Sequence, residues 1–298
     1  MCDNKNVKAM IPSTYFIHPE DEKALAAMKK IPGFDALMRK IMEYGFEKYL
    51  HGVNMASSMR LSEAQDPKGY YRRVRGVCDR LGLECPEVYL ETNPFPNAYT
   101  YGDTRVCMVL TSGLFDYLTD DEVDSVIAHE CGHIICHHVL YHTLARTLLK
   151  GLSTFMTTLA APLVYPLYYW YRKSELSADR VATLLCGPDT VARTQLRLAG
   201  GPKSLAGEVN IDEWVRQAEE YEAIRSGGVW DRFLQMVAAM DQDHPFAAVR
   251  VREARKWSRT EGYRLAAGLL SGKVAICPVC HQAVDPGWAF CRHCGSRL

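Results

Sequence analysis

His129-Glu130-Cys131-Gly132-His133 is the stretch that decides the fold: an H-E-x-x-H motif within a long helical pattern. In a helix, positions i and i+4 share one face, so both imidazoles can bind a single metal ion. Glu130 then lies beside water held by that ion and can take its proton. The motif therefore predicts zinc-dependent hydrolysis of peptide bonds.

A catalytic zinc ion takes three protein ligands and one water, so the motif needs a third residue. One class of zinc peptidases has a histidine six residues after the second one, but Val139 stands there. His137, His138 and His142 follow in the same helical pattern. A side chain one turn further along that helix would have to bend back across His133. We therefore expect these three histidines to be helix-surface groups or neighbours of the site, not ligands.

A better candidate for the third ligand lies downstream, where Glu175 and Asp179 share one helical face. A glutamate would complete a set of two histidines and one carboxylate. An aspartate one turn further on could accept the free N–H of a ligating histidine. The same pair could equally form a solvated acidic face that pairs with Arg180. Spacing alone leaves both interpretations open.

Four separated motifs follow one another along the chain. They are Leu110-Thr111-Ser112-Gly113-Leu114-Phe115 with Asp121-Glu122, His129-Glu130-x-Gly132-His133, Glu175-x-x-x-Asp179-Arg180, and His244-Pro245 with Arg250. Together they resemble the gluzincin family of HtpX-like and CAAX-prenyl-protease-like metallopeptidases, over about Pro32 to Arg252. The resemblance implies that His129, His133 and Glu175 bind a catalytic zinc ion and that Glu130 is the general base.

The same resemblance implies roles for residues around the metal. Asp179 would orient a ligating histidine, and His244 would lie near the developing oxyanion, with Arg250 as its structural anchor. Read without the family, His244 with its following proline fits the first turn of a helix equally well. The substrate-binding residues would be those of the family's edge strand, which pairs with extended substrate backbone: Asn97, Ala98 and Tyr99.

Two C-x-x-C pairs stand near the C-terminus, Cys277-Pro278-Val279-Cys280 and Cys291-Arg292-His293-Cys294. Four thiolates at this spacing predict a closed structural zinc site of the zinc-ribbon type, because so small a module cannot fold without its metal. A redox dithiol is disfavoured because both pairs are present. The expected metal content is one catalytic and one structural zinc ion. We expect the ribbon to bind a protein partner or to recruit substrate.

The remaining pattern predicts an α+β fold that is mostly helical. Helical spacing runs from Glu20 to about Arg60 with a break at Pro32-Gly33, and recurs at 70–81, 119–140, 174–185 and 211–268. Short β-branched or aromatic runs at 87–91, 98–101 and 105–110 predict a small antiparallel or mixed sheet beside the motif helix. We divide the chain into an N-terminal helical segment (1–60), a gluzincin-type metallopeptidase domain (61–268) and a zinc ribbon (272–298).

Residues 151–171 carry no charged side chain and are about as long as a bilayer span. A single crossing here would place His133 and Glu175 on opposite sides of a membrane, and Pro162 and Pro166 would interrupt the helix. We expect a buried or interfacial hairpin arm, with its aromatic residues at an apolar–polar boundary. Peripheral membrane contact or a homo-oligomer contact through this arm stays open.

Whole-chain composition limits the partners. Lys+Arg and Asp+Glu are both 35, and this neutral balance argues against binding to nucleic acid as the function. Eleven cysteines and the lack of a secretory pattern at the N-terminus favour a reducing, cytoplasmic location, with membrane association left open. The sequence thus predicts a zinc metalloendopeptidase acting on extended or unfolded polypeptides. The alternative is a peptide-holding scaffold or chaperone-like factor with structural zinc and little turnover.

Overall fold

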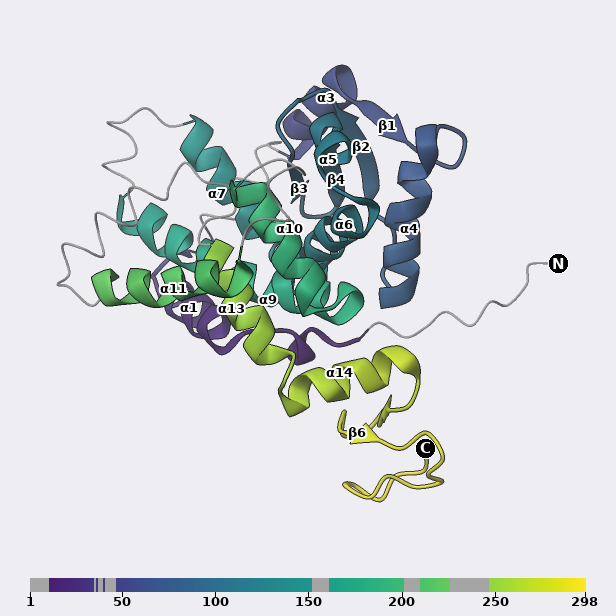
Figure 1. Ribbon diagram of the computed structural model, residues 1–298. Helices are drawn as coiled ribbons and strands as arrows, with labels where there is room; N and C mark the ends of the chain where they lie inside the picture. The colour runs from purple at the N-terminus through teal and green to yellow at the C-terminus, as the bar shows by residue number, and fades with distance from the viewer. Residues whose placement is uncertain are drawn as a thin grey trace.

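The computed structural model describes residues 11–34, 36, 40, 47–151, 161–200, 210–225 and 247–298. The helices are α1 (Pro19–Lys29), α3 (Glu47–Ser57), α4 (Tyr70–Leu81), α5 (Ser112–Tyr117), α6 (Asp120–Ile135), α7 (Val139–Gly151), α9 (Ala161–Cys186), α10 (Pro188–Gly200), α11 (Ile211–Arg225), α13 (Ala247–Trp257) and α14 (Glu261–Ser271). The strands are β1 (Met59–Leu61), β2 (Glu87–Glu91), β3 (Ala98–Tyr101), β4 (Cys107–Thr111), β5 (Ala275–Ile276) and β6 (Ala283–Val284). The expected mostly helical α+β fold is confirmed (Figure 1).

A four-stranded sheet in the order β1-β2-β4-β3 lies beside the motif helix α6. β2 and β4 are parallel and the other two pairs are antiparallel, so the sheet is mixed. Side chains alternate between its two faces. Val88, Met108 and Leu110 pack against α4 and α6, whereas Tyr89 and Val109 form a separate cluster with Leu50 of α3. β3 is an edge strand of this sheet.

The motif helix starts where its capping sequence predicts. The Thr119 backbone N–H donates to Glu122 Oε2 at 2.8 Å, which completes a capping box ahead of Asp120. α6 packs along α9, and Gly132 lies directly against the Ala178 backbone of α9. A Cβ atom at Gly132 would lie only 2.7 Å from Ala178 Cα, so a side chain there would force the helices apart. The glycine therefore brings the motif face of α6 onto the face of α9 that carries Glu175.

Several expected boundaries differ from the observed ones. The long helix predicted through Leu140 ends at Ile135, because His137 adopts a left-handed conformation (φ 58°) and α7 starts a new direction at Val139. The N-terminal helical pattern ends at Ser57 and gives way to β1. The short helix α5, the helix α10 and the strand β1 were not predicted.

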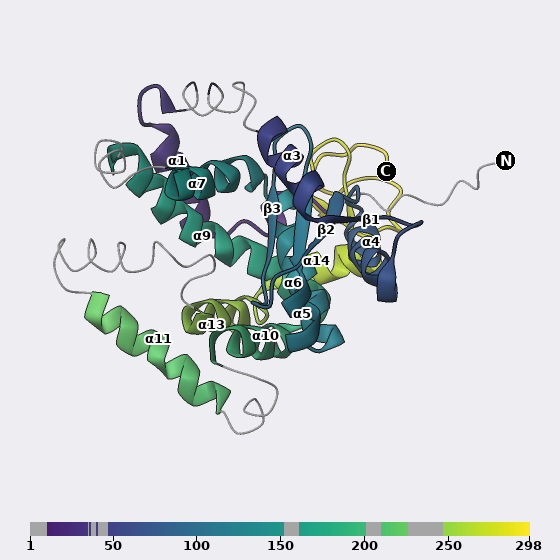
Figure 2. The ribbon, with the colours of Figure 1, turned by 90° about the horizontal axis from the view of Figure 1, so that it is seen from above.

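The segment 151–171 is described only in part, since residues 152–160 lie outside the described residues. Residues from Ala161 onward belong to α9, which packs against α7 and α1. Figure 2 shows these three helices together on one side of β3, with α4 on the other side. Tyr168, Trp170 and Tyr171 are buried in the core instead of lying at a polar boundary, whereas Tyr169 is 40 % exposed. Among the described residues, no helix has the length and apolar character needed to cross a bilayer.

Candidate active site

The two motif histidines and Glu175 converge on one point between α6 and α9. His129 Nε2 lies 3.1 Å from His133 Nε2, and each of these nitrogens lies 3.4 Å from a carboxylate oxygen of Glu175. Ligands about 2.1 Å from a tetrahedral zinc ion are separated from one another by about 3.4 Å. The three side chains therefore have the spacing and the chemistry of a three-ligand zinc site.

Glu130 lies next to this cluster and is 1 % exposed. Within the part of the chain that the structure describes, its Oε1 atom has no hydrogen-bond partner. Three buried carboxylates, of Glu130, Glu175 and Asp179, lie around one buried guanidinium, that of Arg250. When the histidines are neutral, the net charge of this group is therefore minus two. A divalent cation balances that charge, and the residues present thus fit a zinc ion.

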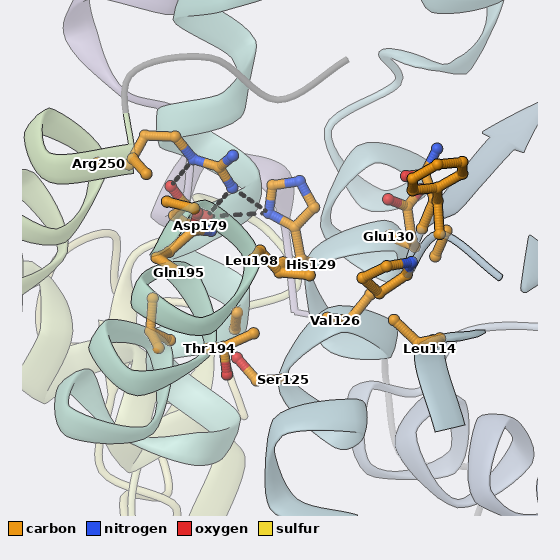
Figure 3. Close-up of a pocket in the computed structure, with 18 residues that line it drawn as sticks. Leu114, Ser125, Val126, His129, Glu130, Asp179, Thr194, Gln195, Leu198 and Arg250 are labelled. Carbon is orange, nitrogen blue, oxygen red and sulfur yellow. Dashed lines mark hydrogen bonds and ion pairs between the residues drawn. The ribbon is translucent and has the colours of Figure 1, made fainter. Parts of the chain in front are cut away.

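Asp179 and Arg250 contact His129 at Nδ1, the ring nitrogen that faces away from His133 and Glu175. Asp179 Oδ1 lies 2.9 Å from His129 Nδ1 and accepts a hydrogen bond from Arg250 Nη2 at 2.6 Å, while Arg250 Nη1 lies 3.1 Å from Glu175 Oε2. Figure 3 shows Arg250 and Asp179 on one side of the His129 ring and Glu130 on the other. The arrangement fixes the His129 ring with its Nε2 toward His133 and Glu175.

Burial and these contacts set the pKa values of the two histidines in opposite directions. Burial disfavours the charged form of His129, but hydrogen bonds with Asp179 and Glu175 outweigh it and raise its pKa to about 9. Burial lowers the pKa of His133 to about 4, although Glu175 opposes this. The lowered pKa of His133 favours its neutral form, which is the form that offers a lone pair to a metal ion.

The Glu130 side of the cluster opens into a cleft of 560 Å³. Its walls come from β3 and the loop before it, α5, α6, α9, α10 and α13, and its apolar lining includes Leu114, Val126 and Leu198 (Figure 3). Asn97 and Ala98 line this cleft. Tyr99 is not among the lining residues: its hydroxyl donates to Glu91 Oε2 at 3.0 Å, and the Arg146 guanidinium lies over its ring. His244 lies outside the described residues.

One part of the site differs from the sequence prediction. His138 is buried and its Nδ1 lies 3.1 Å from His133 Nδ1. The expectation that it would have to bend back along one helix was wrong, because the left-handed residue His137 turns the chain between α6 and α7. Asp21 of α1, which contacts His138, had no signal of its own in the sequence, since it stands among other acidic residues in the first turn of a helix.

The four C-terminal cysteines also converge. Cys277 Sγ lies 3.7 Å from Cys294 Sγ, and Cys280 Sγ lies 3.6 Å from Cys291 Sγ. Four sulfur ligands of one tetrahedral zinc ion are separated by about 3.8 Å. Hydrogen bonds from the Cys280 backbone and the Ser296 hydroxyl lower the pKa of Cys277, which favours the thiolate that binds zinc. The strands β5 and β6 complete this module, which extends beyond α14 (Figure 1).

Comparisons with known proteins agree with the description of both the histidine–glutamate cluster and the four-cysteine module. Residues 70–258 match peptidase family M48, and residues 276–298 match a zinc-ribbon domain. The chain is 30 % identical, over 84 % of its length and 74 % of the other's, to the Plastoglobule-localized metallopeptidase 48, chloroplastic, of Arabidopsis thaliana. A Protease HtpX homolog of Tropheryma whipplei is 36 % identical over 31 % of this chain and 32 % of its own length.

A solved structure, that of S. mikatae Ste24p, aligns with 78 % of this chain and 61 % of its own at 16 % identity and a TM-score of 0.46. The family match covers strands β2, β3 and β4, the motif helix, Glu175, Asp179 and Arg250, and the expected resemblance is confirmed. The chain belongs to peptidase family M48: it is a zinc metallopeptidase with a C-terminal zinc-ribbon domain.

Proposed function

We propose that this metallopeptidase is an endopeptidase that cleaves extended or unfolded polypeptides, with Glu130 as its general base. The supporting observation is that His129, His133 and Glu175 converge at the wall of a cleft that Glu130 also lines. The two imidazole Nε2 atoms lie 3.1 Å apart, and each lies 3.4 Å from one of the two Glu175 carboxylate oxygens. Zinc held there supplies a Lewis acid that acidifies water and polarises the scissile carbonyl. Glu130 takes the proton of the attacking water and returns it to the departing amine.

The edge strand β3 is the proposed binding surface for the substrate backbone. Asn97 O accepts from Thr111 N at 3.0 Å, so Asn97 directs its main-chain groups toward β4. Because pairs alternate along an antiparallel ladder, the main-chain groups of Ala98 point to the opposite side, toward the cleft. A substrate strand added there would be held by main-chain hydrogen bonds, which suits extended chains of many sequences. His244 stays our candidate for stabilising the oxyanion, on the family resemblance alone.

The test is cleavage of a chemically unfolded protein by the zinc-loaded chain, with the fragments mapped by mass spectrometry. Internal cuts that stop with a chelator and return with zinc are the expected result. Release of single terminal residues would exclude an endopeptidase. Binding of the unfolded protein without any cut would favour the alternative, a peptide-holding scaffold.

We further propose two zinc ions per chain, one at the active site and one in the ribbon. Replacing Cys291 by serine removes one of four ribbon thiolates, so we expect the metal content to fall from two ions to one. Cys186→Ser, a partly buried thiol outside the ribbon, is the matched control and should keep both ions. Metal analysis that finds two ions in Cys291→Ser would contradict a four-cysteine site.

The partners of the ribbon, and the location of the protein, also stay proposals. We favour a protein partner or substrate recruitment for the ribbon, whose Val279 and Phe290 side chains are 64 % and 60 % exposed. None of the ten cysteines among the described residues forms a disulfide, which supports a reducing, cytoplasmic location.

A further inference from the structure

The N-terminal helix α1 brings a buried carboxylate close to the metal ligands. Asp21 is 1 % exposed and lies outside the residues 70–258 that match the peptidase family. Its Oδ1 accepts a hydrogen bond from Trp170 Nε1 at 2.8 Å, and its Oδ2 accepts one from Ser177 Oγ at 2.5 Å. Both donors lie on α9, the helix that carries Glu175, so the carboxylate is held in a fixed position against the ligand helix.

His138 connects this carboxylate to His133. Its Nε2 lies 3.0 Å from Asp21 Oδ2, and its Nδ1 lies 3.1 Å from His133 Nδ1. The His138 ring is 1 % exposed and packs edge-on against Trp170 at a centroid distance of 5.5 Å. The three side chains therefore form one buried row of hydrogen-bonding groups that leads from α1 to the motif helix.

Zinc binding by His133 allows only one order of protons along this row. His133 Nε2 faces His129 and Glu175, so this nitrogen offers its lone pair to the metal. The His133 proton then resides on Nδ1 and is donated to His138 Nδ1. The His138 proton resides on Nε2 and is donated to the Asp21 carboxylate. Each nitrogen has one role, and no donor meets another donor.

We propose that Asp21 and His138 are positioning residues of the catalytic centre, which fix the ring orientation and the tautomer of His133. This inference rests on the ligand set proposed above. His129 is held directly by the carboxylate of Asp179, and His133 is held by the carboxylate of Asp21 through one intervening imidazole. The N-terminal helix is thus part of the catalytic centre, although it lies outside the matched family region.

The test is Asp21→Asn in the full-length chain. Whichever way the new amide is turned, its NH₂ group meets a donor, either Trp170 Nε1–H or His138 Nε2–H. We expect the affinity of the catalytic site for zinc to fall by about 10–100-fold, measured by competition with a chelator. Glu22→Gln removes an exposed charge from the same helix and should leave the affinity unchanged. The ribbon ion is identified in the same titration by its loss in Cys291→Ser.

A second variant separates positioning from a general structural role. His138→Gln should weaken zinc binding as well. It replaces Asp21→Asn as the test variant if Asp21→Asn does not fold. Asp21 and His138 act through the same row of hydrogen bonds to His133. The double variant should therefore lose no more zinc affinity than the single variant with the larger loss. Additive losses, or unchanged affinity in folded Asp21→Asn, would overturn the proposal.

Three further outcomes separate this inference from the ligand set on which it rests. A metal content above two ions per chain would mean that His133, His138 and His142, which also converge, bind an ion of their own, and would overturn the positioning role. If His133→Ala keeps wild-type zinc affinity at the catalytic site, the ligand set itself is wrong. If His133→Ala loses that zinc and Asp21→Asn does not, only the role of Asp21 fails.

Discussion

Replacing Glu130 by glutamine should lower kcat by about 10²–10⁴-fold, the usual contribution of a general base, while the chain keeps its zinc. Glutamine has nearly the same shape but cannot take a proton from water. Glu130 is outside the set of three ligand atoms that converge, so its loss leaves them intact. The measurement is the rate of cleavage of an unfolded protein, with the zinc content of the variant and the wild type determined in parallel.

Glu84→Gln, at an exposed glutamate, is the matched control and should behave as the wild type. Full turnover by Glu130→Gln would exclude the proposed mechanism. Loss of zinc from that variant would instead mean that Glu130 holds the metal site together. The two results are distinguishable because metal content and turnover are measured on the same sample.

The second large effect is expected at the buried ion pairs of Arg250. This side chain is 2 % exposed and contacts both Asp179 and Glu175. Arg250→Met leaves the buried Asp179 carboxylate without its guanidinium partner, and removing one partner of a buried pair typically costs about 3–5 kcal/mol. We expect the free energy of unfolding of the zinc-loaded protein in urea to fall by that amount.

The double variant Asp179→Leu/Arg250→Met separates stability from catalysis. It removes one negative and one positive charge together, so no uncompensated charge stays buried, and it should be more stable than Arg250→Met. Turnover should stay low because His129 has lost the acceptor for its Nδ1 proton. A double variant no more stable than Arg250→Met would contradict this charge-balance explanation.

Arg255→Met is the control on the same helix. Arg255 pairs with Asp212 at 2.6 Å, but Asp212 is 85 % exposed at its side chain, and such surface pairs are worth about 0–1 kcal/mol.

The buried Asp179–Arg250 ion pair should make the free energy of unfolding depend on pH in the acid range. Burial would raise the pKa of Asp179, but Arg250 and His129 outweigh it and lower the pKa from 3.8 to about 2. A carboxylate with a depressed pKa stabilises the folded state above its unfolded pKa, and that contribution disappears as the pH falls from about 4 to about 2. Arg250→Met removes the main cause of the depressed pKa of Asp179. The loss of stability over the same pH range should therefore be smaller in this variant, which urea unfolding at a series of pH values would show.

Sequence patterns correctly predicted the helices and strands whose ends are set by residues close by in the sequence. The helix predicted at 70–81 and the strands at 87–91 and 98–101 have the observed bounds, and the capping box marks the start of α6. The end of α6 was missed because one left-handed residue, His137, interrupts a hydrophobic pattern that continues through Leu140. Hydrophobic spacing carries no information about a single backbone angle.

The sequence by itself indicated the kind of chemistry and the residues that we propose perform it. The H-E-x-x-H spacing places His129 and His133 on one helical face, and the i, i+4 spacing does the same for Glu175 and Asp179, because helix geometry is local. Only the tertiary structure decided that these faces meet, through the close contact at Gly132, and that Asp179 takes His129 as its partner. It also brought Asp21 to His138 across 117 positions of the chain, a contact that no local spacing encodes because it depends on how α1 packs on α9.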